Sequence, residues 1–207
     1  MTCTLEELRN NLSGPSAEYR RKQLHPVPDA PVVVRETFIL ERVKGKAVLD
    51  IGASGKMHEA IVKAAKRCYG IDRPPPGWSD VAGLHRCGDE FGINLDDYHA
   101  ELPQLPDVEL VVCGEVLEHL ANPGFFLERL RRGYNGVPVI ISVPNAFNDI
   151  CPESLKAGIE NVNDDHVAWY SFTTLKTLLR RYGYEIREWC WYKGRQRFAE
   201  GLIAVTG

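Results

Sequence analysis

Apolar and polar positions alternate along the chain in a pattern that predicts an α/β fold. Short apolar runs of strand length alternate with stretches in which apolar residues return every three or four positions. The runs assigned to strands span residues 47–51, 68–71, 91–95, 108–113, 137–143, 184–192 and 198–206. Helical periodicity marks residues 34–43, 57–67, 124–132 and 171–182. This alternation predicts a Rossmann-like, doubly wound, mostly parallel seven-stranded sheet that binds ligands at the carboxyl ends of its strands.

The last two strand-like runs lie too close together for a crossover helix. Only residues 193–197 separate them. Parallel neighbours need a connection of about a dozen residues or more, so these two strands must pair antiparallel. We therefore expect a C-terminal antiparallel hairpin at one edge of the sheet.

The first 33 residues differ in character from the rest of the chain. Thr4 and Glu7 have capping-box spacing and open a short helix, a second helical piece covers 17–24, and residues 25–31 are rich in proline. We therefore divide the chain into an N-terminal helical extension with a proline-rich linker, residues 1–33, and one domain, residues 34–207.

Charge and composition restrict the class of protein. The formal net charge of -3 gives no general attraction to nucleic acid or anionic membranes. The longest apolar runs are strand-sized, and the N-terminus lacks an apolar leader, so we expect a cytoplasmic protein without a membrane partner. The six cysteines form no C-x-x-C pair, and several lie in strand-like runs, which favours buried free thiols over disulfides or zinc.

The first strand ends at Asp50 and runs into a turn that contains glycine. The dinucleotide fingerprint G-x-G-x-x-G falls on Gly52, Ser54 and Met57, so only one of its three glycines is present. A carboxylate at Asp50 would repel a pyrophosphate but suits a ligand that carries an ammonium and a sulfonium. S-adenosylmethionine is such a ligand, and we favour it over NAD.

Acidic residues also end the next two strands. Asp72 is placed to accept both ribose hydroxyls, and its alternative role is that of a turn acid before prolines. Asp96 is placed to accept from the adenine amino group, with Asp97 or a plain loop acid as competing interpretations. The predicted cofactor-binding residues are Asp50, Gly52, Ala53, Gly55, Asp72, Arg73, Asp96 and Gly114.

A second group of polar residues follows the fourth strand. Glu115, Glu118 and His119 have the spacing i, i+3, i+4, which places them on one face of a helical turn. Such carboxylates can simply stabilise a helix dipole. Alternatively, His119 acts as a general base with Glu118 beside it, or the group holds a cation.

Together these motifs resemble those of class I S-adenosylmethionine-dependent methyltransferases. The resemblance extends from about residue 34 to the C-terminus and rests on VLDIG (48–52), GID (70–72), CGEVLEHLANP (113–123) and SVPN (142–145). A final antiparallel strand is typical of that family. In the family's D-x-G-x-G-x-G loop, Ser54 and Lys56 replace the second and third glycines. Lys56 either pairs with the methionine carboxylate or marks a reshaped turn.

The E-x-x-E-H motif is similar to that of quinone-biosynthesis O-methyltransferases, for which the resemblance implies a divalent cation. A weaker similarity connects the chain with small-RNA 3′-terminal 2′-O-methyltransferases, which add a second histidine after the fifth strand. His166 stands at a comparable place. The implied metal ligands are Glu115, Glu118, His119 and His166. Two imidazoles would favour manganese, iron, cobalt or zinc over magnesium.

The leading hypothesis is O-methylation of a hydroxyl on a small-molecule or glycan acceptor, with His119 and Glu118 as catalytic residues. The alternatives are metal-dependent methylation of an RNA 3′ end and a non-catalytic subunit that binds S-adenosylmethionine. The polar segment 146–165 is long for a connection and is the expected substrate lid. Four aromatic residues could stack on a substrate or belong to the core: Trp169, Tyr170, Trp189 and Trp191.

Overall fold

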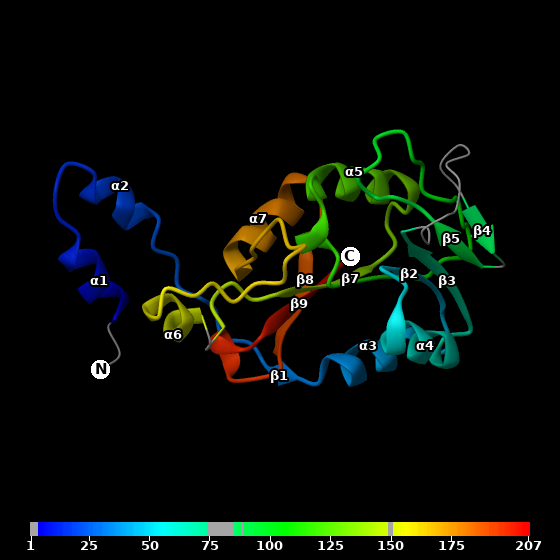
Figure 1. Ribbon diagram of the computed structural model, residues 1–207, viewed down its shortest axis with the longest axis horizontal. Coiled ribbons are helices and arrows are strands. Elements are labelled where there is room, and N and C mark those ends of the chain that lie inside the picture. The colour runs from blue at the N-terminus through cyan, green and yellow to red at the C-terminus, as the bar shows by residue number, and fades with distance from the viewer. Residues whose placement is uncertain (1–3, 74–84, 88, 149–150) are drawn as a thin grey trace.

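The computed structural model describes residues 4–73, 85–87, 89–148 and 151–207. Within these ranges, nine strands form one sheet in the order β1-β8-β9-β7-β6-β2-β3-β5-β4 (Figure 1). The strands are β1 (Val32–Val33), β2 (Ala47–Ile51), β3 (Arg67–Asp72), β4 (His85–Cys87), β5 (Glu90–Gly92), β6 (Leu110–Gly114), β7 (Val139–Pro144), β8 (Ile186–Tyr192) and β9 (Gly201–Thr206). Strands β4 and β9 run against their neighbours, and the other strand pairs are parallel.

The predicted fold class is confirmed, including the hairpin, which β8 and β9 form. All seven predicted strands are present, and the short edge strands β1 and β4 are additional. The third predicted strand is shorter than expected, because the Asn94 side chain accepts a hydrogen bond from the Asp96 amide and turns the chain out of the sheet. The last strand begins at Gly201, after a 3₁₀ turn, η2 (Gln196–Phe198).

Helices cover both faces of the sheet. Figure 1 shows α3 (Arg35–Val43) and α4 (Gly55–Ala64) on one face, and α5 (Pro123–Gly133) and α7 (Phe172–Arg181) on the other. Two short helices, α1 (Leu5–Asn11) and α2 (Ala17–Lys22), stand apart from the sheet, and α6 (Cys151–Lys156) lies in the segment predicted as a lid.

Local sequence explains where these helices begin. The Thr4 hydroxyl accepts a hydrogen bond from the Glu7 amide, and the Glu7 carboxylate accepts one from the Thr4 amide. Asn122 caps α5 by accepting from the Phe125 amide at 3.0 Å, and Pro123 occupies the first helical position. The capping box of Thr4 and Glu7 agrees with the sequence-based expectation.

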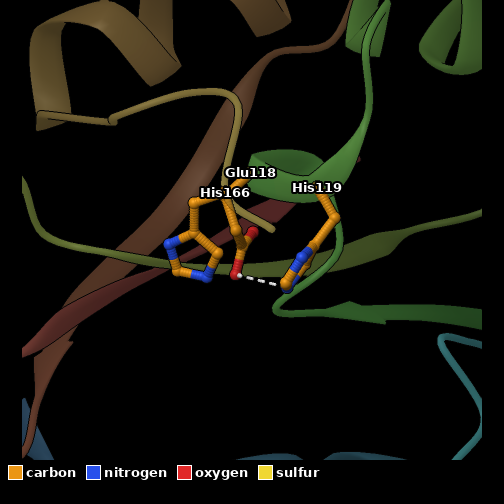
Figure 2. Close-up of side chains that lie close together, drawn as sticks. All are labelled: Glu118, His119 and His166. Atoms are coloured by element: carbon orange, nitrogen blue, oxygen red, sulfur yellow. Dashed lines mark ion pairs between the residues drawn. The ribbon is translucent and has the colours of Figure 1, made fainter. Parts of the chain in front are cut away.

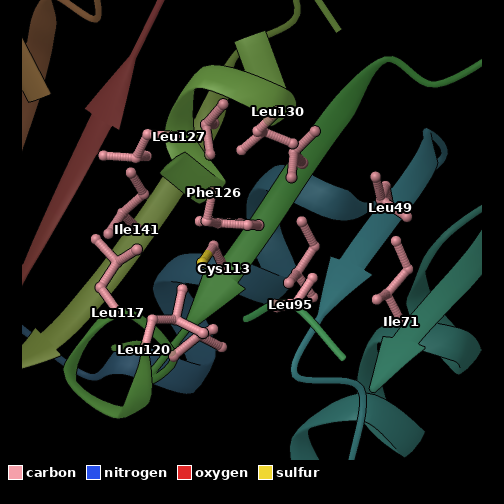
Figure 3. Packing of buried hydrophobic residues seen from close by; sticks show 14 of the residues in the cluster. Leu49, Ile71, Leu95, Cys113, Leu117, Leu120, Phe126, Leu127, Leu130 and Ile141 are labelled. Atoms are coloured by element: carbon pink, nitrogen blue, oxygen red, sulfur yellow. The ribbon is translucent and has the colours of Figure 1, made fainter. Parts of the chain in front are cut away.

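The core consists of two apolar layers, one on each face of the sheet. Successive strand residues point to opposite faces, so Leu49 packs toward α5 while Val48 packs toward α3 and α4. Figure 3 shows Phe126 inserted against Cys113 and Ile141. Truncating a fully buried phenylalanine of this kind costs about 3–5 kcal/mol. This packing fixes the strand ends on which the polar residues stand.

Three cysteines with described side chains, Cys68, Cys113 and Cys190, are buried free thiols, as predicted. Cys3 and the side chains of Cys87 and Cys151 lie outside the described part. None of the helices in the described ranges combines the length and apolar character of a membrane span.

Candidate active site

A first cavity of about 420 Å³ opens at the carboxyl ends of β2, β3 and β6. These strands are neighbours in the sheet in the order β6-β2-β3, although β4 and β5 come between β3 and β6 in the sequence. Five of the predicted cofactor-binding residues line this first cavity: Asp50, Gly52, Asp72, Arg73 and Gly114. Ser54 also lines it, whereas Lys56 does not.

Three other residues of the predicted set lie outside the lining. The Ala53 amide donates to the Ile71 carbonyl at 3.0 Å, and Gly55 is the first residue of α4. The Asp96 carboxylate accepts a hydrogen bond from the Ala121 amide at 3.0 Å. The structure therefore gives Asp96 a partner on the chain rather than a position in the first cavity.

Gly52 holds the turn close to the following strand. Its φ of 78° lies in the left-handed region, and its amide donates to the Ile71 carbonyl at 2.8 Å. A Cβ atom at this position would lie 2.6 Å from Cγ2 of Val116. Any other residue would therefore strain the backbone and push into the first cavity's lining.

His58 was not anticipated from the sequence. It lines the first cavity, and its Nδ1 lies 2.8 Å from Oδ2 of buried Asp50, while its Nε2 lies 3.2 Å from Oε1 of Glu90. The hydrogen bond with Asp50 raises the pKa of His58, and burial raises the pKa of Asp50. A histidine one turn into a helix that follows a strand-end acid is the signal that could have identified it.

Glu118, His119 and His166 form a compact group, which we call the Glu118 cluster. One ligand atom from each lies within 4.8 Å of the others. Glu118 and His119 come from the 3₁₀ turn η1 (Leu117–His119), and Figure 2 shows the Glu118 carboxylate beside both imidazoles. Nε2 of His119 lies 3.9 Å from Oε1 of Glu118. The spacing predicted from the sequence thus brings these two residues together.

The electrostatics of the Glu118 cluster are unusual. Glu118 is 1% exposed, and within the described part of the chain its carboxylate oxygens have no hydrogen-bond partner. Burial, with the Glu115 charge nearby, raises the pKa of Glu118 to about 8. Burial and the neighbouring His119 lower the pKa of His166. A buried carboxylate beside two imidazoles has the composition of a divalent cation site.

The loop that carries His166 is tied to η1 by backbone hydrogen bonds. The Glu118 carbonyl accepts from the amides of Val167 at 2.8 Å and Ala168 at 3.2 Å. The Tyr170 hydroxyl donates to the Leu117 carbonyl at 3.3 Å. This attachment explains how a residue 47 positions beyond His119 enters the same cluster.

Glu115 has a different environment from Glu118. Its Oε1 accepts hydrogen bonds from the Ser142 hydroxyl at 2.9 Å and the Tyr192 hydroxyl at 2.8 Å. Nη1 of Arg35 lies 3.3 Å from the same oxygen. Burial and the adjacent Glu115 raise the pKa of Tyr192. Glu115 therefore stands at the side of the Glu118 cluster, held by three partners from other elements.

A second cavity of about 960 Å³ lies on the other side of Glu115. Arg35 and Glu115 line both cavities, His119 lines the first, and His166 lines the second. The second cavity also includes Asn148, Asn161, Val162 and Asn163 from the predicted lid and Trp169 beyond it. Tyr170 and Trp191 belong to the core, and Trp189 packs against it. The Glu118 cluster thus lies where the two cavities meet.

The chain matches the model of a known protein family. The family model described as a methyltransferase domain matches residues 24–188. The chain belongs to this methyltransferase family. The sequence-based prediction of a class I methyltransferase is therefore confirmed at the level of family and fold.

Individual methyltransferases similar to this chain differ in their acceptors. Over 95 residues, 44% of this chain and 36% of the relative, the chain is 35% identical to the ubiquinone biosynthesis O-methyltransferase of Azorhizobium caulinodans. The small-RNA methyltransferase HEN1 superposes with a TM-score of 0.64 at 18% identity over 88% of this chain and 26% of that one. The magnesium protoporphyrin IX methyltransferase of Synechocystis PCC 6803, solved with bound SAH, superposes with a TM-score of 0.57 at 11% identity. The superposition covers 98% of this chain and 99% of that one. The chain thus spans about a third of the curated relative's length.

Proposed function

We propose that this methyltransferase transfers a methyl group from S-adenosylmethionine to a hydroxyl of a small-molecule or glycan acceptor. The observation that carries the proposal is the position of Glu118, a buried carboxylate without a hydrogen-bond partner in the described chain, at the meeting point of two cavities. One cavity suits the donor and the other suits the acceptor. Residues 34–207 would form the catalytic domain and residues 1–33 an extension.

The first cavity fits S-adenosylmethionine in charge and shape. Asp50 and Asp72 line it with Asp165, and Gly52 leaves space that a side chain would fill. Asp50 would attract the ammonium and sulfonium, and Asp72 would accept from the ribose hydroxyls. When bound, the cofactor supplies an electrophilic methyl group. The chain's contribution is to hold the donor at the strand ends, facing the Glu118 cluster.

The Glu118 cluster fits a divalent cation, because a buried carboxylate without a hydrogen bond in the described chain and two imidazoles converge there. Glu118, His119 and His166 would hold the ion. The bonds of Glu115 to Ser142 and Tyr192 both use its Oε1, so Glu115 would join them through Oε2. A bound cation would lower the pKa of an acceptor hydroxyl.

Where no cation is bound, the alternative role of His119 is to accept the hydroxyl proton. Its Nδ1 lies 3.0 Å from Oδ2 of Asp165, whose negative charge would stabilise a positive charge on the ring. Glu118 lies on the other side of the ring, and its raised pKa permits proton exchange near neutral pH. These residues would remove the proton as the methyl group arrives in line.

Methyl transfer from labelled S-adenosylmethionine tests the proposal. We expect transfer to a hydroxyl acceptor in mixed small-molecule and glycan extracts, and a loss of at least about 100-fold for Glu118→Ala and His119→Ala. Glu128→Ala, a change on α5 outside both cavities, is the control and should retain full transfer. Cofactor binding without any transfer would instead support a non-catalytic subunit.

One observation favours a second candidate, methylation of an RNA 3′ end. His166 does enter the Glu118 cluster, as the similarity to small-RNA methyltransferases implied. A short RNA with a 2′-hydroxyl terminus should then be methylated, with loss of activity on chelation or on His166→Ala. The same RNA with a 2′-deoxy terminus is the matched control. An RNA that is left unmodified while small hydroxyl acceptors react would exclude this candidate.

A further inference from the structure

The second cavity has a lining that indicates which kind of hydroxyl compound it accepts. It combines paired charges, side-chain amides and one exposed aromatic ring beside the Glu118 cluster. The inference drawn from this lining rests on the proposed function, because it identifies the acceptor of that reaction.

The charged groups of the second cavity are largely paired with each other. Nζ of Lys193 lies 2.6 Å from Oε2 of Glu200, and Arg35 pairs with Glu115. Lys193 and Arg35 are the two permanent cations among the described lining residues, and Glu36 adds a further carboxylate. A phosphate-bearing acceptor needs unpaired lysine or arginine side chains to replace its counterions. The second cavity therefore favours an uncharged acceptor.

Three asparagines, Asn148, Asn161 and Asn163, supply the neutral polar part of the lining. An amide side chain both donates and accepts hydrogen bonds, as a hydroxyl does. Within the described chain, the side chains of Asn161 and Asn163 make no hydrogen bond, so they are available to a ligand. An acceptor with several hydroxyls would satisfy them.

Trp169 adds an aromatic surface to this polar setting. It is 40% exposed although tryptophan is usually well buried, and it lines the second cavity. Its neighbours are fixed, because the Ala168 amide donates to the Glu118 carbonyl and the Tyr170 hydroxyl donates to the Leu117 carbonyl. The chain on both sides of Trp169 is thus attached to η1, and Trp169 lines the same cavity as His166 of the Glu118 cluster. An aromatic face stacks on the C–H face of a pyranose ring, while the hydroxyls at the ring edge remain free for amides.

We propose that the second cavity binds a sugar ring, with Trp169 as the stacking surface and Asn161 and Asn163 as hydroxyl partners. The acceptor is then a neutral glycan or glycoside, and one of its hydroxyls lies beside the Glu118 cluster. A catechol offers only two hydroxyls to the amides, and an RNA terminus brings phosphates into a cavity whose cations are paired.

Saturation-transfer NMR on the full chain tests this inference. The probes are the methyl glycosides of mannose, galactose and rhamnose, with 3,4-dihydroxybenzoate and a short RNA for comparison. We expect signals from the ring C–H protons of at least one glycoside, weakened at least about fivefold in Trp169→Ala and partly kept in Trp169→Phe. Phe198→Ala, at a residue that is 46% exposed and outside the lining, should leave them unchanged.

Two results would overturn the inference. One is the absence of any glycoside signal, with or without binding of dihydroxybenzoate or RNA, and the other is glycoside binding that is insensitive to Trp169→Ala. Calorimetry with S-adenosylmethionine on the same sample distinguishes failure of the sugar-binding inference from failure of the proposed function. If the cofactor binds and the glycosides do not, the acceptor inference alone fails. If the cofactor does not bind, the proposed function fails, while the glycoside spectra still decide what the second cavity holds.

Discussion

Arg35 and Glu115 form an ion pair, 3.3 Å from Nη1 to Oε1, at the place where the first and second cavities meet. Arg35 is the first residue of α3, where a cation is unfavourable to the helix dipole. The guanidinium also lies over the Tyr192 ring, 5.4 Å from its centre. Because Arg35 is unfavourable to the helix dipole at this position, we infer that its role is to hold Glu115.

Replacing Arg35 should therefore affect turnover more than stability. Arg35→Met would remove one of the three partners that hold Glu115 in the described chain, and we expect methyl transfer to fall about tenfold or more. Because both ion-pair partners are partly exposed, the free energy of unfolding should fall by only about 1 kcal/mol. Arg42→Met is the control, since Arg42 lies on the same helix and pairs with Glu188 at 2.8 Å away from both cavities. Equal losses of turnover in the two variants would contradict this role.

Glu118→Gln should stabilise the protein while abolishing methyl transfer. The folded-state pKa of Glu118, about 8, lies above its usual value of 4.5, so the native protein binds a proton that the unfolded chain releases. Without a cation, this group reduces stability progressively as the pH rises from about 4.5 to about 8. In EDTA at pH 8 the glutamine variant should melt several degrees higher, and at pH 5 the difference should shrink.

Manganese provides the complementary measurement for the Glu118 cluster. The ion should raise the melting temperature of the wild type and leave that of Glu118→Gln unchanged. A glutamine variant that is less stable than the wild type at pH 8 in EDTA would contradict the interpretation of Glu118 as an uncompensated buried acid.

The contact of His58 with Asp50 should add a separate pH dependence. Because the folded-state pKa of His58 is raised, its contribution to stability is fully present below about pH 6.5 and is lost as the pH rises through the raised value. Urea unfolding at pH 6 and pH 9 should show a drop in stability that is about 1 kcal/mol smaller in His58→Gln than in the wild type, because the contribution of Glu118 remains in both. His25→Gln, at an exposed histidine of the linker, should keep the wild-type drop. An equal pH dependence in all three proteins would refute the contribution.

The turn after β2 allows a comparison of two glycines. Gly52→Ala adds a methyl group 2.6 Å from Val116 at a φ of 78° and should cost about 2 kcal/mol or more, with weaker cofactor binding. Gly55 has a φ of 62° but open space around it, so Gly55→Ala should cost about 1 kcal/mol. Denaturant unfolding and calorimetry measure both effects. A Gly55 variant that is as damaged as the Gly52 variant would show that the Val116 contact is unimportant.

Features that depend on nearby residues could be predicted from the sequence. The strand-end positions of Asp50 and Asp72 follow from short apolar runs, and the hairpin follows from a connection too short for a crossover. Glu118 and His119 lie together because their spacing places them within one turn. Each of these inferences needs only local chain geometry.

Features that depend on tertiary packing could not be predicted. The bond from Tyr192 to Glu115 joins residues 77 positions apart, on strand ends that β9 and β7 separate in the sheet. His58 reaches Asp50 because α4 packs back over β2. Asp96 meets the Ala121 amide across two loops whose approach no local pattern encodes.

Calorimetric titration of the purified chain with S-adenosylmethionine, and separately with NAD, tests the central claim most directly. We predict saturable binding of S-adenosylmethionine at one site, weakened at least about tenfold by Asp72→Ala. NAD should show no binding, because Asp50 faces its pyrophosphate position. Binding of NAD without binding of S-adenosylmethionine would contradict the account.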